Sequence, residues 1–98
     1  MTIFAATKFL IMIKINDWRL KGQEKYLKGV TLYLKRYYKY SETWDHDHCE
    51  FCWAKFSFER LPDALDEGYA TKDSYHWICK RCFDDFKVIF QWIVEELP

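Results

Sequence analysis

The sequence carries two matched cysteine pairs, Cys49-Glu50-Phe51-Cys52 and Cys79-Lys80-Arg81-Cys82. Two residues lie inside each pair, and 26 residues separate one pair from the other. Zinc prefers four tetrahedral ligands, and a two-residue gap lets one tight turn offer two thiolates to the same ion. Two such turns would fill the coordination shell. We therefore expect one structural Zn²⁺ ion bound by Cys49, Cys52, Cys79 and Cys82.

Other states of these cysteines stay open at this point. Two disulfides would suit a secreted protein, one reactive pair would suit thioredoxin-like redox chemistry, and iron also accepts four thiolates. The sequence shows no clear secretory signal, and its apolar run Phe9–Ile13 lies between Lys8 and Lys14. That run is far shorter than the roughly 20 residues of a membrane span. We expect a cytoplasmic protein with reduced cysteines and no membrane partner.

The pattern around the second cysteine pair predicts a hairpin followed by a helix. Two β-prone runs, 69–71 and 74–78, flank a two-residue turn and predict a short β-hairpin. Asp84 and Asp85 are expected in the first turn of the helix, where carboxylates complement the helix dipole. The helix itself is predicted from apolar side chains at helical spacing, namely Phe83, Phe86, Phe90, Ile93 and Leu97.

This order of elements resembles the treble-clef zinc finger over about residues 46–97. That fold has a zinc knuckle, a β-hairpin and a C-terminal helix that supplies the last two ligands. Zinc ribbons share the cysteine spacing but end in a strand. The apolar residues at helical spacing after Cys82 therefore favour the treble clef over the ribbon. The resemblance implies a small α+β fold, treble-clef-like, with residues 45–98 as its zinc-binding segment.

The preceding segment, residues 16–44, is basic and predicts a second helix. Apolar and aromatic side chains recur at helical spacing over residues 23–40, which predicts an N-terminal amphipathic helix packed on the zinc-binding segment. Gly29 and the β-branched pair Val30-Thr31 disfavour a helix, so a strand through residues 30–34 is the alternative. Residues 1–15 are expected to be a strand or an extension, and the whole chain, 1–98, a single domain.

The composition fits a compact chain with an aromatic core. Half of the 98 residues are hydrophobic and 20% are aromatic. Disordered proteins have few aromatic residues and a high net charge, so this composition argues against disorder. The polar stretch 41–48 is predicted as a loop, and residues 59–67 as holding one helical turn. We expect the aromatic residues around the metal to form the core, namely Trp53, Phe56, Phe58, Trp77, Phe83, Phe86 and Phe90.

The formal net charge is zero, but the two halves differ in sign. Residues 1–44 hold nine basic and three acidic residues, whereas residues 45–98 hold six basic and twelve acidic ones. A basic half with many tyrosines suggests nucleic-acid binding by stacking and phosphate contacts. The alternative is that the two halves complement each other within one fold.

The stretch Asp45-His46-Asp47-His48 resembles the Asp-His-Asp-His stretch of HNH endonucleases. The resemblance implies a catalytic divalent metal beside His46 or His48. In zinc-bearing members of that family the stretch lies between the two cysteine pairs, but here it precedes both. The last predicted helix also lacks the Asn or His that completes the metal site. These histidines are instead expected to hydrogen-bond a cysteine sulfur, or one of them to replace a cysteine as ligand.

Four stretches of the chain, 18–29, 44–56, 67–71 and 75–79, also resemble a family of small bacterial proteins with no assigned function. This resemblance implies no activity. We expect a non-enzymatic protein that binds another protein, as adaptors, immunity proteins and anti-defence factors do. Nucleic-acid binding through the basic half is the alternative, and an HNH-like nuclease is the second alternative. The oligomeric state is left open.

Overall fold

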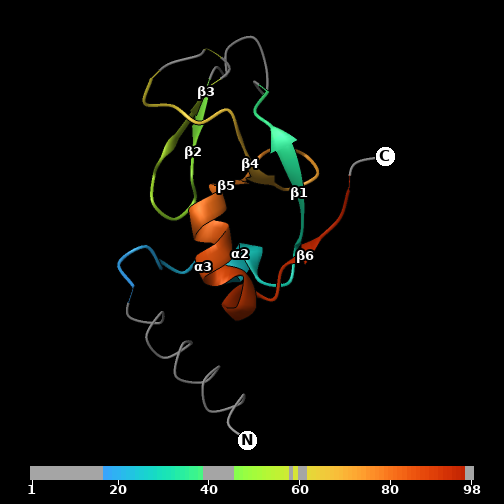
Figure 1. Cartoon of the computed structure of the whole chain (residues 1–98). Helices are drawn as coiled ribbons and strands as arrows, with labels where there is room; N and C mark the ends of the chain where they lie inside the picture. The colour runs from blue at the N-terminus through green and yellow to red at the C-terminus, as the bar shows by residue number, and fades with distance from the viewer. Residues whose placement is uncertain (1–16, 39–45, 58, 60–61, 97–98) are drawn as a thin grey trace, which may run out of the picture.

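The computed structural model describes residues 17–38, 46–57, 59 and 62–96, and the statements below concern those residues. They form two helices and six short strands (Figure 1). The helices are α2 (Glu24–Leu27) and α3 (Lys80–Phe90). The strands are β1 (Thr31–Arg36), β2 (His46–His48), β3 (Lys55–Ser57), β4 (Glu67–Ala70), β5 (Trp77–Ile78) and β6 (Ile93–Val94). The predicted α+β class is therefore confirmed, while the expectation for residues 1–15 lies outside the described residues.

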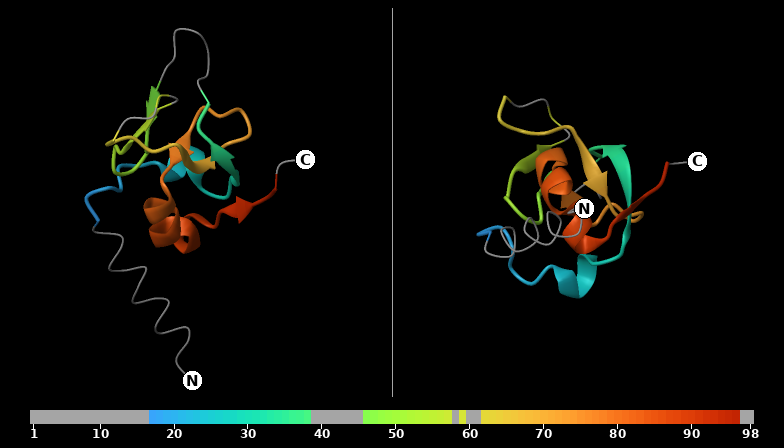
Figure 2. Two further views of the ribbon diagram at one scale, coloured as in Figure 1. Left: turned by 45° about the horizontal axis from the view of Figure 1, so that its top comes forward. Right: turned by 60° about the horizontal axis from the view of Figure 1, so that its bottom comes forward.

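The strands form two sheets that flank α3. One sheet has the order β5-β4-β1-β6, and the other is the β2–β3 hairpin. Strand β1 pairs antiparallel with β4 and parallel with β6. Figure 2 shows β2 and β3 on one side of α3 and β1 with β6 on the other. Stacking of Tyr69 in β4 on Phe83 in α3, with ring centroids 3.7 Å apart, joins the larger sheet to the helix.

The hairpin predicted before the second cysteine pair is present. Strands β4 and β5 are antiparallel, with Ala70 opposite Trp77. Asp73 stabilises the connecting loop, because its Oδ1 accepts hydrogen bonds from the Thr71 hydroxyl at 2.6 Å and the Tyr75 backbone N–H at 3.0 Å. These bonds hold the pKa of Asp73 below its usual value. The stabilised loop thereby fixes the direction of the chain as it approaches Cys79.

The predicted N-terminal amphipathic helix is wrong. Helix α2 ends at Leu27, Lys28 is extended, and Gly29 has a φ of +73°. A positive φ interrupts a right-handed helix, and the β-branched residues that follow favour a strand. The chain therefore continues as β1, which confirms the alternative of a strand in this region. Strand β1 gains backbone partners on both sides, which a surface helix would not provide.

The C-terminal helix is present but differs from the prediction at both ends. Its buried face consists of Phe83, Phe86 and Phe90, as expected. The helix begins at Lys80, with Cys79 as N-cap, so Asp84 and Asp85 are not in its first turn. It ends where Gln91 adopts a left-handed φ of 54°, and the chain then forms β6 instead of continuing to Leu97.

Two further predictions of local structure need correction. His46–His48 form strand β2, not a loop, because β3 provides backbone partners along its whole length. In the described part of 59–67 no helical turn is present, and Leu65 instead forms a bridge with Phe56. This bridge ties the start of β4 to the β2–β3 hairpin.

One hydrophobic core lies between α3, the larger sheet and the β2–β3 hairpin. Five of the seven predicted aromatic core residues are buried, but Trp53 is 60% exposed and Phe58 lies outside the described residues. No helix among the described residues is long and apolar enough to cross a membrane. The buried core consists of Leu27, Leu32, Tyr37, Cys49, Phe51, Phe56, Ala70, Trp77, Ile78, Cys79, Cys82, Phe83, Phe86 and Phe90.

Candidate metal centre

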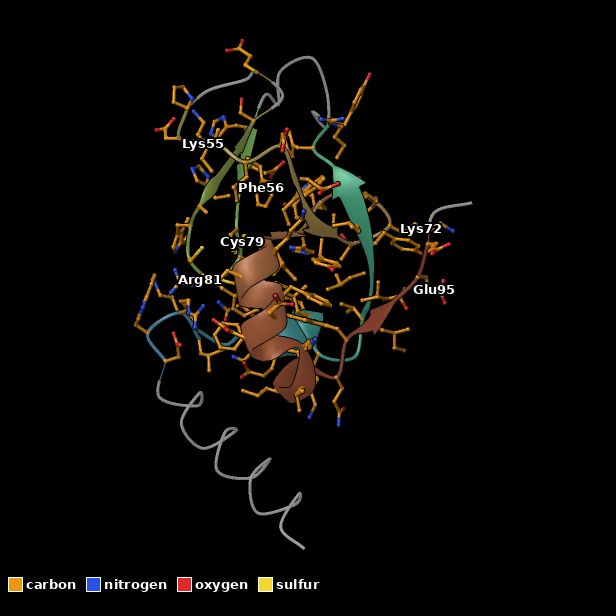
Figure 3. The ribbon with its side chains drawn as sticks, in the orientation of Figure 1. Lys55, Phe56, Lys72, Cys79, Arg81 and Glu95 are labelled. Atoms are coloured by element: carbon orange, nitrogen blue, oxygen red, sulfur yellow. The ribbon has the colours of Figure 1, made fainter. Side chains whose placement is uncertain are left out.

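The four cysteines that the sequence singles out lie together in the structure. Their sulfur atoms are all within 4.8 Å of one another. One pair lies in the turn between β2 and β3, and the other lies at the start of α3 (Figure 3). Among the described residues this is the one group of three or more His, Cys, Asp or Glu side chains positioned to hold a metal ion. The predicted ligand set is therefore brought together as expected.

The first pair is held by the backbone of the β2–β3 turn. Cys49 donates its N–H to the carbonyl oxygen of Ala54 at 2.8 Å, and its own carbonyl accepts the N–H of Trp53 at 3.1 Å. Trp53 has a φ of 67°, which lets the chain reverse after Cys52. Inside the turn, the Phe51 N–H donates to Cys49 Sγ at 3.4 Å. The turn thus presents both sulfurs on one side.

The second pair is held by the N-terminus of α3. Cys79 is the N-cap, and its Sγ accepts the backbone N–H of Cys82 at 3.4 Å. An N-cap side chain that accepts this bond satisfies a free N–H of the first turn, and the helix N-terminus favours negative charge there. Cys82 follows within that first turn and is fully buried. The helix therefore fixes two thiols where thiolates are favoured.

Backbone contacts join the two pairs directly. The Cys79 N–H donates to Cys49 Sγ at 3.4 Å, across 30 residues of sequence. The Glu50 N–H donates to the Trp77 carbonyl at 2.9 Å, and Cys49 forms a parallel bridge with Trp77. The relative position of the pairs is thus set by main-chain bonds, with little side-chain freedom.

The geometry fits one tetrahedral thiolate-bound ion. Zn–S bonds of about 2.3 Å place the sulfurs of a tetrahedron about 3.8 Å apart. Cys52 Sγ and Cys79 Sγ are 3.6 Å apart, and all four cysteines are free thiols without disulfides. Four soft sulfur ligands suit zinc or iron, and they are poor ligands for magnesium or calcium. The residues present therefore fit a tetrathiolate metal site.

Electrostatics in the cluster favour a cation at its centre. Hydrogen bonds with the Cys49 and Cys82 side chains and with the Cys82 backbone N–H lower the pKa of Cys79 well below its usual value. The pKa of Cys82 is raised, by its contacts with the Cys49 and Cys79 sulfurs and by burial. One thiolate in this group therefore opposes ionisation of the next. A divalent cation removes this conflict, because it attracts all four thiolates at once.

Arg19 belongs to the centre, although sequence reasoning missed it. Its Nη1 donates to Cys82 Sγ at 3.5 Å and to Asp85 Oδ2 at 2.9 Å, while its Nη2 contacts Asp17 Oδ2 at 2.6 Å. The guanidinium also lies over the Phe86 ring, 4.4 Å from its centroid. Arg19 is 63 residues away from Cys82 in sequence, so no local pattern signals the contact.

A second cluster next to the first cysteine pair was also missed. Glu50, inside the knuckle, accepts a hydrogen bond from the Tyr26 hydroxyl at 3.1 Å, and its other oxygen lies 2.8 Å from His76 Nδ1. Burial and the Glu50 carboxylate raise the pKa of Tyr26 to about 12. The cluster connects α2 and the β4–β5 loop, which holds His76, to the β2–β3 turn.

His46 and His48 lie in β2 with exposed side chains, and their ring centroids are 5.2 Å apart. Neither belongs to the metal-ligand cluster, so the expectation that one replaces a cysteine as ligand is wrong. The N–H groups that contact the cysteine sulfurs are the backbone amides of Phe51, Cys79 and Cys82 and the guanidinium of Arg19. Among the described residues, neither histidine belongs to a group of three or more side chains positioned to hold a metal ion.

Comparisons with known proteins found no family model, curated protein or solved structure that matches the chain. The resemblance of four stretches to a small bacterial family therefore stays a prediction.

Proposed function

We propose that the four cysteines bind one Zn²⁺ ion and that the fold around it is treble-clef-like. The order of elements supports this. A knuckle lies in the β2–β3 turn, the β4–β5 hairpin follows, and α3 supplies the last two sulfurs from its first turn. The observation that carries the proposal is the packing of four reduced sulfurs within 4.8 Å.

We infer that the ion has a structural role and that the protein is not an enzyme. Four thiolates complete a tetrahedral shell, and catalytic zinc sites instead keep one position for water or substrate. Three of the four cysteines are buried in the hydrophobic core, so the ion would connect the knuckle to α3 from inside. In a chain of this length, such a link adds stability that a small core supplies poorly.

The partner is proposed to be another protein. Trp53, beside the knuckle, and Trp18 are 60% and 66% exposed, and exposed tryptophans are typical anchors of protein interfaces. Several cations of the basic half are already engaged within the fold. Arg19 contacts Asp17 and Asp85, Arg36 contacts Asp66, and Lys35 Nζ donates to the carbonyl oxygens of Thr71 and Lys72. This internal pairing favours a protein partner over nucleic acid.

The metal is tested by elemental analysis of the full chain purified under reducing conditions. We expect one zinc ion per chain, and we expect a strong chelator to lower the melting temperature or abolish cooperative unfolding. Cys82→Ser should lose the ion, whereas the matched surface variant His48→Ala should retain it. A metal-free protein whose melting does not respond to chelator would overturn the proposal.

The role is tested with the same zinc-loaded protein. Tagged chain should recover a protein partner in fixed ratio, and Trp53→Ala should reduce that recovery while zinc content stays unchanged. Recovery of nucleic acid in place of protein, or metal-dependent nuclease turnover that His48→Ala abolishes, would contradict a non-enzymatic protein-binding role.

A further inference from the structure

The four sulfurs have unequal surroundings. Cys49 Sγ accepts two backbone N–H groups, those of Phe51 and Cys79. Cys79 Sγ accepts the N–H of Cys82, and Cys82 Sγ accepts Nη1 of Arg19. Among the described residues, Cys52 Sγ contacts only another sulfur, that of Cys79 at 3.6 Å. Within the described part of the chain, Cys52 Sγ therefore has no N–H donor, whereas each of the other three sulfurs has at least one.

Exposure follows the same division. Cys49, Cys79 and Cys82 have exposed fractions of 1%, 6% and 0%, whereas Cys52 is only partly buried. An N–H donor withdraws charge from a thiolate and lowers its nucleophilicity, and burial blocks access of a reagent. Both effects protect three sulfurs, and neither protects the fourth to the same degree. Cys52 is therefore the sulfur that a reagent from solvent reaches first.

We propose that Cys52 is a site of oxidative modification by peroxides, and that its oxidation releases the metal ion. This inference rests on the zinc site proposed above. The Cys52 thiolate attacks one oxygen of the peroxide, so an S–O bond forms, the O–O bond breaks and hydroxide leaves. The product is a sulfenic acid on Cys52, which a neighbouring thiolate can resolve.

Cys79 is the resolving thiolate, because its Sγ is the one in contact with Cys52 Sγ. It attacks the Cys52 sulfur, an S–S bond forms, and a second hydroxide leaves. Protons from solvent convert both hydroxides to water, so two thiolates lose two electrons and one peroxide gains them. The ion then has two thiolate ligands in place of four, and it dissociates.

Arg19 is a positioning residue in this scheme. Its hydrogen bond to Cys82 Sγ keeps that sulfur less nucleophilic and so directs attack to Cys52. Arg36 offers a matched control, because it is also ion-paired with an aspartate, Asp66, but it is 76% exposed and lies outside the cluster.

The experiment begins with zinc-loaded full chain whose metal content has been measured. Limiting N-ethylmaleimide, followed by peptide mapping, should label Cys52 on the order of tenfold faster than the other three cysteines. Substoichiometric hydrogen peroxide should release one zinc ion for each disulfide formed, and mapping should place that disulfide between Cys52 and Cys79. Arg19→Gln should raise the labelling rate of Cys82 relative to Cys52, and Arg36→Gln should leave the ratio unchanged.

The outcomes separate this inference from the proposed function. A chain without zinc defeats the metal site itself. A zinc-loaded chain that is labelled evenly, or first at Cys49, Cys79 or Cys82, or whose disulfide omits Cys52, overturns the inference and leaves the metal site standing. Labelling and disulfide mapping of the wild-type protein test the role of Cys52 even if the Arg19→Gln variant fails to fold.

Discussion

Gly68 shows how a single position limits the packing around the metal. A Cβ atom added there would lie 2.7 Å from Phe56 Cε1 and 2.8 Å from the Ile78 carbonyl oxygen. Both neighbours lie in strands next to the cysteine pairs, since Phe56 in β3 follows the first pair and Ile78 in β5 directly precedes Cys79. Only glycine lets β4 approach these elements so closely.

Gly68→Ala is therefore expected to lower the free energy of unfolding by about 1–3 kcal/mol, because the core must shift to accept the methyl group. Denaturant unfolding of the zinc-loaded protein measures the change. Arg36→Ala, at an exposed position on the neighbouring strand, should change it by less than about 0.5 kcal/mol. Equal effects of the two variants would refute the close approach at Gly68.

Tyr37, which directly follows β1, contacts the β2–β3 hairpin through a partly buried hydrogen bond. Its ring is 4% exposed, and its hydroxyl donates to Asp47 Oδ2 at 2.7 Å. Tyr37→Phe should destabilise the fold by about 1–3 kcal/mol, because it removes a hydrogen bond to a charged acceptor. Tyr33→Phe, in the strand that precedes Tyr37, should have a much smaller effect in the same denaturant titration. If both variants have the same free energy of unfolding, the hydrogen bond between Tyr37 and Asp47 contributes no measurable stability.

At the scale of elements, the sequence predicted what local periodicity can define. The spacing of Phe83, Phe86 and Phe90 identified the buried face of α3, and the cysteine spacing identified the metal cluster. Strand β1 was predicted as a helix because its apolar residues also fit helical spacing. What decides between the two is pairing with β4 and β6, which lie more than 30 residues further along the chain. Arg19 was missed for the same reason, since its partners are equally remote.

Local periodicity also could not predict the residue at which α3 ends. Gln91 takes a left-handed conformation, and its N–H lies against the carbonyl oxygens of Lys87 and Val88. Glycine adopts this conformation at less cost. Gln91→Gly should therefore raise the free energy of unfolding by about 0.5–1 kcal/mol. Lys87→Gly, inside the helix, should lower it by about 1 kcal/mol in the same thermal or denaturant unfolding measurement. A loss of stability in both variants would contradict the left-handed cap.

At the scale of the whole molecule, opposite charges of the two halves form ion pairs with each other. Arg19, from the basic half, is ion-paired with Asp85, and Arg36 with Asp66. This arrangement supports the interpretation that the halves complement each other.

We therefore expect no tight binding of single-stranded or double-stranded nucleic acid at physiological salt. Fluorescence anisotropy with labelled oligonucleotides, titrated from low to high salt, measures this directly. Strong binding that falls steeply with salt would reveal a phosphate-binding surface and reverse the choice of partner. Lys21→Ala is the informative variant in that case, because Lys21 Nζ lies 5.9 Å from the exposed Trp53 ring.

Strand β6 lies beside β1, and the N–H of Trp92 Nε1 reaches back to the Leu27 carbonyl at 2.8 Å. An early strand and the last strand described are thus direct neighbours. During synthesis on the ribosome, β1 emerges long before the strand that covers its open edge. The nascent chain must keep this edge from pairing with other chains until residue 94 has left the exit tunnel. Completion of the sheet therefore waits for the last strand described, and a ribosome that stalls before this strand has emerged releases a chain with an unprotected β edge.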